Sequence, residues 1–221
     1  MEDLEIMCDL PRMEEVKIAI GMLKNNKAAG PDNKPAEVIK ADVQLAAEHF
    51  LPLIHKIWHE ETCPSDWKNG HITILPKKGD LSLFGNHRGI MLTSVPGRIL
   101  SRIILNRIKR KVDEKLRPNQ AGFRSNRSTI EQITTLRIII EQSKEWNSDL
   151  FINFINYAKA FDSILRKILW HYGIPNKIVN IIKSMYTGGV GSVMFKGKLS
   201  PPFEIKTGLN KAVCYLHSSS S

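Results

Sequence analysis

The sequence is poor in cysteine, with only Cys8, Cys63 and Cys214 among its 221 residues. An odd number of widely spaced cysteines argues against a disulfide framework and fits a reducing compartment. No apolar segment follows a basic start, and no uninterrupted apolar run reaches the ~18 to 20 residues of a membrane span. We therefore expect an intracellular protein, in the nucleus or the cytoplasm, with no signal peptide and no membrane partner.

Acidic residues are also outnumbered, 22 against 32 lysines and arginines, which gives a net charge of +10. Such an excess favours a polyanion partner such as nucleic acid, and a surface with many lysines is the alternative interpretation. Hydrophobic residues make up 42% of the chain, so it can form a packed core.

Apolar residues at helical spacing predict helices over residues 13–23 and 96–116. The second has an apolar stripe, and basic residues coat its other faces, either as a solvated surface or as a nucleic-acid contact. The basic coat consists of Arg98, Arg102, Arg107, Lys109, Arg110 and Lys111. Ser128 and Glu131 form a capping box that predicts a helix to about residue 146. Another helix should include residues 45–58, bent or divided at Pro52.

Short strand patterns complete the prediction. Residues 71–76 read as a strand ended by proline, and residues 190–195 can pair with residues 203–206 as a hairpin. Residues 150–155 are almost wholly apolar, which predicts a strand buried on both faces. Pro175 should begin a further helix.

Four motifs occur in one order and together resemble the reverse transcriptases of non-LTR retrotransposons. Asn26 to Asp32 is similar to the family's Lys-x-x-Gly-Pro-Asp-Gly loop, with Asn33 in place of the last glycine. The fingers motifs are matched by residues 74–77 with 86–92, and Gln120 to Ser128 is similar to Gln-x-Gly-Phe-Arg-x-x-Arg-Ser. Residues 154–162 resemble the first palm motif.

The resemblance implies an α+β fold, with helix-rich fingers and an incomplete palm of a right-hand polymerase. We expect fingers and an N-terminal extension over residues 1–149, a partial palm over 150–209 and a tail over 210–221. It also implies an RNA template and a DNA primer as partners, and magnesium as the cofactor of the intact family. The oligomeric state cannot be predicted from these patterns.

Catalysis in this family uses two divalent ions, which require carboxylate ligands. The resemblance places Asn156 where the first palm motif has its metal-binding aspartate. An amide is neutral and binds magnesium less well than a carboxylate, so we expect this chain to hold no metal and to be inactive by itself. Asp162, six residues later, is interpreted as an acid at a helix start.

The resemblance implies two further groups of site residues. Lys77 and Arg88 would hold the triphosphate of the incoming nucleotide, and Phe161 would act as a steric gate against the ribose 2′-hydroxyl. Their alternatives are two surface cations and a core aromatic residue. The template contacts would be Gln120, Phe123, Arg124 and Arg127, because an aromatic ring between arginines suits stacking and phosphate contact. A core position for Phe123 beside a helix cap is the alternative.

Two other patterns are weak. Gly30-Pro31-Asp32 lacks the lysine that ends a phosphate-binding P-loop, so a turn is the better interpretation. His55, His59 and Cys63 could hold zinc only if a second ligand pair followed, and none does.

The tail after Leu209 does not match the family's next motif. One set of codons for Asn210 to His217 is AAC AAG GCT GTC TGC TAT CTC CAT. Without its first two bases it encodes Gln-Gly-Cys-Leu-Leu-Ser-Pro, which is that motif, so we hypothesise a frameshift near Leu209. The candidate functions are therefore a fragment of a retrotransposon polymerase, a residual nucleic-acid-binding module, or a pseudogene product with no selected function.

Overall fold

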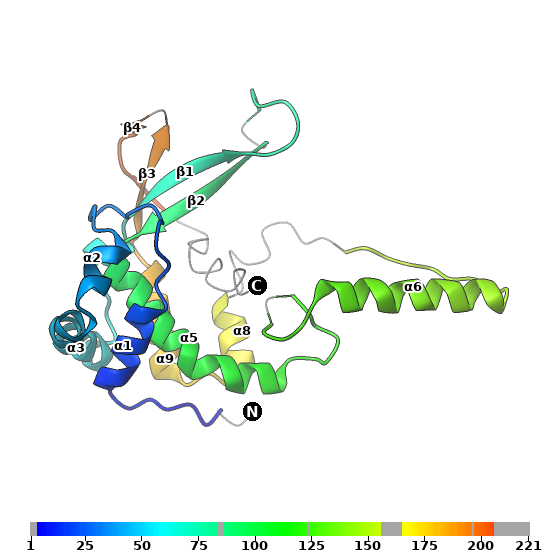
Figure 1. The fold of residues 1–221 in the computed structure, drawn as a ribbon, viewed down its shortest axis with the longest axis horizontal. Helices are drawn as coiled ribbons and strands as arrows, with labels where there is room; N and C mark the ends of the chain where they lie inside the picture. Colours follow the sequence, from blue (N-terminus) through cyan, green and yellow to red (C-terminus); the bar gives the residue numbers. More distant parts are fainter. Residues whose placement is uncertain (1–3, 84–85, 123, 156–164, 196, 206–221) are drawn as a thin grey trace.

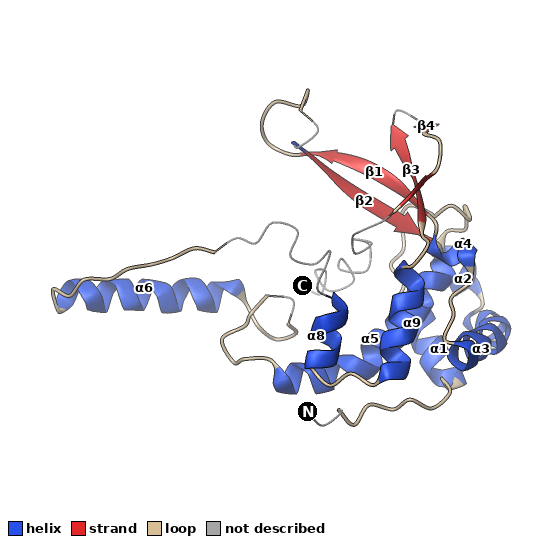
Figure 2. Cartoon of the chain, turned by 180° about the vertical axis from the view of Figure 1, so that it is seen from behind, coloured by secondary structure: helices blue, strands red, loops and turns tan. Residues whose placement is uncertain are grey.

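The computed structural model describes residues 4–83, 86–122, 124–155, 165–195 and 197–205. A helical body carries a small twisted sheet on one side, and one long helix projects away from both (Figures 1 and 2). The mixture of helices with a sheet confirms the predicted α+β composition. The assignment of the parts to fingers and palm stays a prediction.

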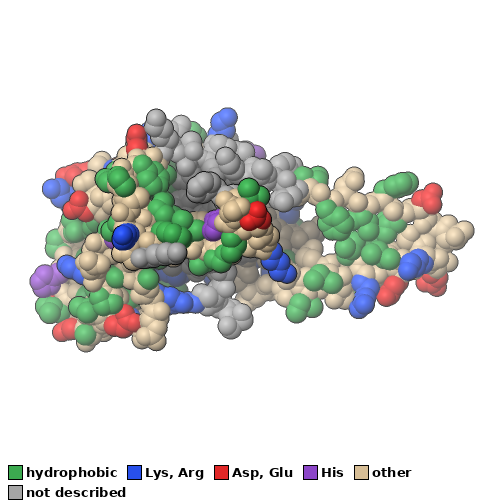
Figure 3. Space-filling model, turned by 90° about the horizontal axis from the view of Figure 1, so that it is seen from above, with side chains coloured by type: hydrophobic (Ala, Val, Ile, Leu, Met, Phe, Trp, Pro, Cys, Tyr) green, Lys and Arg blue, Asp and Glu red, His purple; other side chains and the backbone are tan. Residues whose placement is uncertain are grey.

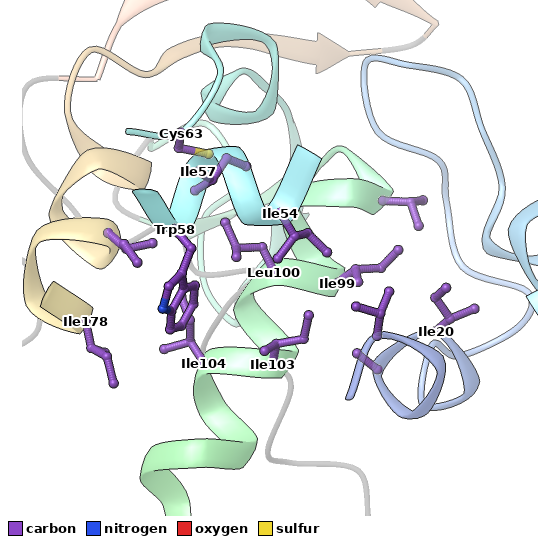
Figure 4. Packing of buried hydrophobic residues seen from close by; sticks show 14 of the residues in the cluster. Ile20, Ile54, Ile57, Trp58, Cys63, Ile99, Leu100, Ile103, Ile104 and Ile178 are labelled. Carbon is purple, nitrogen blue, oxygen red and sulfur yellow. The ribbon is translucent and has the colours of Figure 1, made fainter. Parts of the chain in front are cut away.

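The helical body is built around one hydrophobic core. Seven helices form it: α1 (Met13–Gly21), α2 (Ala36–Ala41), α3 (Val43–Glu60), α4 (Ser65–Lys68), α5 (Val95–Lys115), α8 (Leu165–His171) and α9 (Asn176–Tyr186). Trp58 lies fully buried among apolar side chains from α3, α5 and α9 (Figure 4). The predicted stripe of α5 supplies Ile99, Ile103 and Ile104 to this core, so the periodicity identified the buried face correctly.

Pro52 does not divide α3. The helix runs unbroken from Val43 to Glu60, and the Asp42 carboxylate caps it by accepting a hydrogen bond from the Leu45 amide at 2.9 Å. A helix-interior proline removes one backbone hydrogen bond. Here the buried side chains before and after it, Ala47 and Ile54, keep both halves packed on the same core. The predicted division was therefore wrong.

Arg107 of α5 joins three parts of the helical body. Its Nε and Nη2 donate to the two carboxylate oxygens of Glu15 in α1 at 2.7 and 2.8 Å. Its Nη1 donates to the carbonyls of Met7 and Asp9 at 3.0 and 2.6 Å, and its guanidinium lies 4.9 Å from the Trp58 ring centroid. The side chain is only 4% exposed, so the prediction that Arg107 belongs to a basic surface coat was wrong.

The sheet has strand order β2-β1-β3-β4, with β5 also paired to β3. Its strands are β1 (Gly70–Pro76), β2 (His87–Thr93), β3 (Val190–Phe195), β4 (Lys198–Leu199) and β5 (Phe203–Glu204). β1 and β2 form an antiparallel hairpin, and β3 lies parallel to β1. The predicted strand over residues 71–76 is confirmed. The pairing of residues 190–195 with residues 203–206 is confirmed at Val190–Glu204 and Gly191–Phe203.

The projecting helix is α6 (Thr129–Glu145), which begins where the sequence predicts. The Ser128 hydroxyl accepts a hydrogen bond from the Ile130 amide at 3.1 Å and so caps its first turn. None of its residues is buried, and apolar side chains gather on its surface (Figure 3). Ile130 and Ile133 are 70% and 66% exposed.

Residues 150–155, which follow α6, do not form the predicted buried strand. They have no strand pairing, and Phe151 and Phe154 are 88% and 85% exposed. A strand needs a neighbour to accept and donate its backbone hydrogen bonds. No such neighbour lies beside this segment among the residues whose structure is described, and the prediction was wrong for this chain.

Candidate nucleic-acid interface

Lys77 and Arg88 lie on the β1–β2 hairpin. The register pairs Leu75 of β1 directly with Arg88 of β2, so these two side chains share one face of the hairpin. Lys77 follows β1 directly, so it lies at the same end of the hairpin as Arg88, which is next to the last paired residues Pro76 and His87. Both cations are exposed. The two residues predicted to hold the triphosphate thus lie at one end of the hairpin, and their role stays a prediction.

The end of this hairpin is held by local hydrogen bonds. The Lys77 amide donates to the Asn86 carbonyl at 2.7 Å, and the Asn86 side chain donates to the Asp80 carbonyl, also at 2.7 Å. The Asp80 carboxylate accepts from the amide and the hydroxyl of Ser82, each at 2.8 Å, and these bonds lower the pKa of Asp80. Among the described residues of the turn, these bonds hold the ends of the two strands together.

The other end of β2 meets the Gly30-Pro31-Asp32 loop. A Cβ atom on Gly30 would lie 2.4 Å from the Thr93 carbonyl oxygen and 2.8 Å from the Ser94 amide nitrogen. The Asp32 carboxylate accepts from the Val95 amide at 3.3 Å, at the start of α5. This geometry supports the interpretation of the loop as a turn, and the turn packs directly on the β2–α5 connection.

Buried polar groups surround the same connection. Three of their atoms have no hydrogen-bond partner among the residues that the structure describes: Asp32 Oδ1, Ser94 Oγ and Arg98 Nε. Burial lowers the pKa of Arg98, and the nearby Asp32 charge opposes that shift. Burial also lowers the pKa of Arg102. These two arginines of the predicted basic coat are therefore partly withdrawn from solvent.

The predicted template contacts lie in the loop between α5 and α6. Gln120 and Arg127 are exposed there, whereas the Arg124 side chain is only 7% exposed. Arg124 Nε and Nη2 donate to the Asp113 carboxylate at 2.7 and 3.1 Å. This pair raises the pKa of Arg124 and lowers that of Asp113.

The hairpin and this loop occupy separate parts of the molecule, with the hairpin at the top of Figure 1 and the loop low beside α6. The structure therefore groups Lys77 with Arg88, and Gln120 with Arg124 and Arg127, but does not unite the two groups. Three predicted site residues, Phe123, Asn156 and Phe161, lie outside the described residues, as do Asp162 and the 210–221 tail.

No arrangement of His55, His59 and Cys63 suggests zinc. His55 Nε2 lies 2.8 Å from the Pro11 carbonyl oxygen. Burial raises the pKa of the Cys63 thiol to about 11, so it is not a thiolate at neutral pH. Across the described ranges, no group of three or more His, Cys, Asp or Glu residues could hold a metal ion.

The helices in those ranges also include none with the length and apolarity needed to cross a lipid bilayer.

Sequence comparisons identify relatives of this chain. Residues 75–210 match the family described as reverse transcriptase (RNA-dependent DNA polymerase). The chain is 30% identical over 187 residues to the probable RNA-directed DNA polymerase from transposon BS of Drosophila melanogaster, covering 83% of this chain and 20% of that protein.

Two other relatives are retrotransposon proteins. An uncharacterized 149 kDa protein of transposon TX1 from Xenopus laevis is 23% identical over 203 residues, 90% of this chain and 16% of that protein. The Pol polyprotein from type-1 retrotransposable element R2 of Popillia japonica is 30% identical over 101 residues, 46% of this chain and 14% of the polyprotein. The chain thus spans a fifth or less of the length of these relatives.

Proposed function

Because this chain belongs to the reverse transcriptase family, with relatives among non-LTR retrotransposon proteins, we propose that it is a fragment of a LINE-type RNA-directed DNA polymerase. Its β1–β2 hairpin holds the triphosphate of an incoming deoxynucleotide, and its α5–α6 loop contacts the template. By itself the chain binds these partners without joining nucleotides.

The observation that supports this proposal is the register of β1 with β2, in which Arg88 pairs with Leu75 and Lys77 directly follows the last pair, Pro76 and His87. A triphosphate presents several anionic oxygens within a few ångströms. Two cations on a rigid hairpin can donate charge-assisted hydrogen bonds to different phosphates, and Arg88 can do so with two donors in a fork. Phe161 as the steric gate remains part of the proposal on sequence grounds.

Catalysis is a separate requirement. Magnesium would act as a Lewis acid that favours deprotonation of the primer hydroxyl and stabilises the charge on the leaving pyrophosphate, and it needs anionic oxygen ligands. The position that supplies the first of these in the family holds Asn156, whose amide carries no charge. The residues present do not fit the metal pair, so the proposed role of this chain ends at binding.

The proposed division keeps residues 1–149 as fingers with an N-terminal extension, 150–209 as partial palm, and 210–221 as a frameshifted tail. The family match ends at residue 210, which supports a change of reading frame near Leu209. Sequencing the encoding nucleic acid tests this point. A coding sequence that does not give Gln-Gly-Cys-Leu-Leu-Ser-Pro in the shifted frame would remove the frameshift.

Measuring nucleotide binding tests whether the hairpin holds the triphosphate. We expect Lys77→Ala and Arg88→Ala each to weaken binding of a fluorescently labelled dATP about tenfold or more, since a hydrogen bond to a charged group contributes roughly 1.5–3 kcal/mol. Fluorescence anisotropy measures the dissociation constants. Unlabelled dATP should displace the probe, and deoxyadenosine, which lacks phosphates, should not.

Lys78→Ala is the matched control, because Lys78 is an exposed neighbour with the same charge that lies in the turn. We expect it to bind the probe nearly as the parent chain does. Equal losses for Lys77→Ala and Lys78→Ala would show that only net charge matters, and the proposed triphosphate site would be wrong.

A specific observation also favours nucleic-acid binding without any nucleotide specificity, namely the excess of ten positive charges. In that case RNA affinity would fall steeply with salt, as phosphate contacts require. Affinity for the labelled dATP would then fall by the same small factor in Lys77→Ala, Arg88→Ala and Lys78→Ala, which separates this candidate from the first.

A further inference from the structure

The guanidinium of Arg124 has used all of its hydrogen-bond donors within the protein. A guanidinium has five N–H groups. Two donate to the Asp113 carboxylate, one to the Asp113 carbonyl at 3.2 Å, and two to the carbonyls of Arg117 and Gln120 at 2.9 and 3.3 Å. Five bonds for five donors leave none for a phosphate or a base.

These bonds hold the loop that follows α5. Asp113 belongs to the last turns of α5, and the two carbonyls belong to the loop, so Arg124 ties residues 117–120 back to the helix. Two backbone hydrogen bonds also stabilise this loop. The Gln120 amide donates to the Arg117 carbonyl, and the Arg124 amide donates to the Ala121 carbonyl. Ala121 is 8% exposed and anchors the loop between them.

Three other polar side chains of the loop are open to solvent. Arg117, Gln120 and Arg127 are exposed. Asn126, just before Arg127, has a φ of 59°, a left-handed conformation that reverses the chain direction. Arg117 and Arg127 thus come before and after Arg124 in the loop, and both are exposed.

We propose that Arg124 is a positioning residue, which together with Asp113 folds the α5–α6 loop, and that Arg117 and Arg127 make the phosphate contacts of this loop. The inference rests on the proposed function, because it assigns roles within the proposed template contact. If Arg124 turned to bind a phosphate, it would break its bidentate ion pair with Asp113 and leave the Arg117 and Gln120 carbonyls without their donor. We therefore expect the Arg124–Asp113 pair to persist when nucleic acid binds.

Removing the negative charge of Asp113 separates the two roles of Arg124. If Arg124 contacts phosphate, Asp113→Asn removes a repulsive charge and frees the guanidinium, so RNA binds more tightly. If Arg124 positions the loop, Asp113→Asn weakens RNA binding about as much as Arg124→Gln does. We expect a loss of about tenfold for each. The double variant should be no weaker than either single variant, because both break the same pair.

The experiment measures binding of a single-stranded RNA to the full chain over a salt titration. Arg124→Lys keeps the charge but not the fork, so we expect it to weaken binding as Arg124→Gln does. Glu114→Gln is the matched control, since Glu114 is an acid next to Asp113 that is 55% exposed, and it should bind RNA as the parent chain or slightly better. Arg127→Gln should reduce the slope of log affinity against log salt by about 0.7, the value for one lost single-strand phosphate contact.

Three outcomes decide the inference. Tighter binding by Asp113→Asn, or full binding by Arg124→Lys, would overturn the positioning role. Circular dichroism of each variant shows whether the helices remain. Weaker RNA binding by a variant whose helix content is unchanged supports the positioning role of Arg124. Salt-insensitive RNA binding by the parent chain would instead contradict the proposed function itself.

Discussion

Replacing Arg107 with methionine lowers the free energy of unfolding by about 1.5–3 kcal/mol, the range for a hydrogen bond to a charged group, because Glu15 is 25% exposed and keeps its bond from the Arg12 amide. The substitution removes the two hydrogen bonds that the Glu15 carboxylate accepts from Arg107. It also leaves the Met7 and Asp9 carbonyls without the guanidinium group that donates to them. Methionine is chosen because it fills a similar apolar volume beside Trp58. Urea unfolding followed by circular dichroism measures the change.

Arg110→Met is the control for this prediction. Arg110 lies on the same helix, but its side chain is 82% exposed and its distance to Glu114 is 3.9 Å. An exposed pair of this kind contributes at most about 1 kcal/mol. Similar small losses for the Arg107 and Arg110 variants would mean that Arg107 does not hold the helical body together.

The pH dependence provides a second readout of the same pair. The hydrogen bonds from Arg107 lower the pKa of Glu15 below its usual 4.5 in the folded chain. A lowered folded pKa means that this carboxylate stabilises the fold above the unfolded pKa and loses that effect as the pH falls through the folded value. The stability difference between the parent chain and Arg107→Met should therefore shrink below about pH 4.5.

Replacing Gly30 with alanine lowers the free energy of unfolding by about 3 kcal/mol, the upper part of the range for an overpacked site. The added methyl group would lie 2.4 Å from the Thr93 carbonyl oxygen, and backbone atoms cannot rotate away as side chains can. The loop must then retreat from the β2–α5 connection, which also removes the bond from the Val95 amide to Asp32. The same urea titration measures the effect.

Gly21→Ala is the matched control, because nothing lies within 4 Å of a Cβ atom on Gly21. Gly21 is the last residue of α1, where alanine is up to about 1 kcal/mol more favourable than glycine in a helix. We expect the control to be neutral or stabilising. A Gly30→Ala chain as stable as Gly21→Ala would mean that the close packing of the loop on β2 is absent.

Periodic patterns in the sequence predicted the elements whose shape depends on their own residues. The stripe of α5, the serine cap of α6 and the proline start of α9 are all confirmed. The same reasoning failed for residues 150–155, because an apolar run does not reveal whether a partner strand is present. The parallel pairing of β1 with β3 was not predicted, since it joins residues more than a hundred positions apart.

The sequence predicted which residues belong to the candidate site, but not the environment of each one. The family resemblance placed Lys77 and Arg88 in the same group, and the strand register puts both at one end of the hairpin, but their role stays a prediction. Arginines are indistinguishable in a sequence, however, and the structure shows three environments for them. Arg107 is in an ion pair of the helical body, Arg124 is in a pair that folds a loop, and Arg127 is exposed. Only the hydrogen-bonding partners of each arginine, which are distant in sequence, distinguish these three environments.

Primer extension is the most direct test of the central claim, that this chain binds the partners of a reverse transcriptase without performing its chemistry. The full chain is incubated with an RNA template, an annealed and labelled DNA primer, magnesium and the four deoxynucleoside triphosphates. The primer should be retained by the protein at low salt and remain at its original length, because the proposed assignment puts the amide of Asn156 where the family has its first metal-binding carboxylate. Template-directed lengthening of the primer by this chain alone would contradict the account.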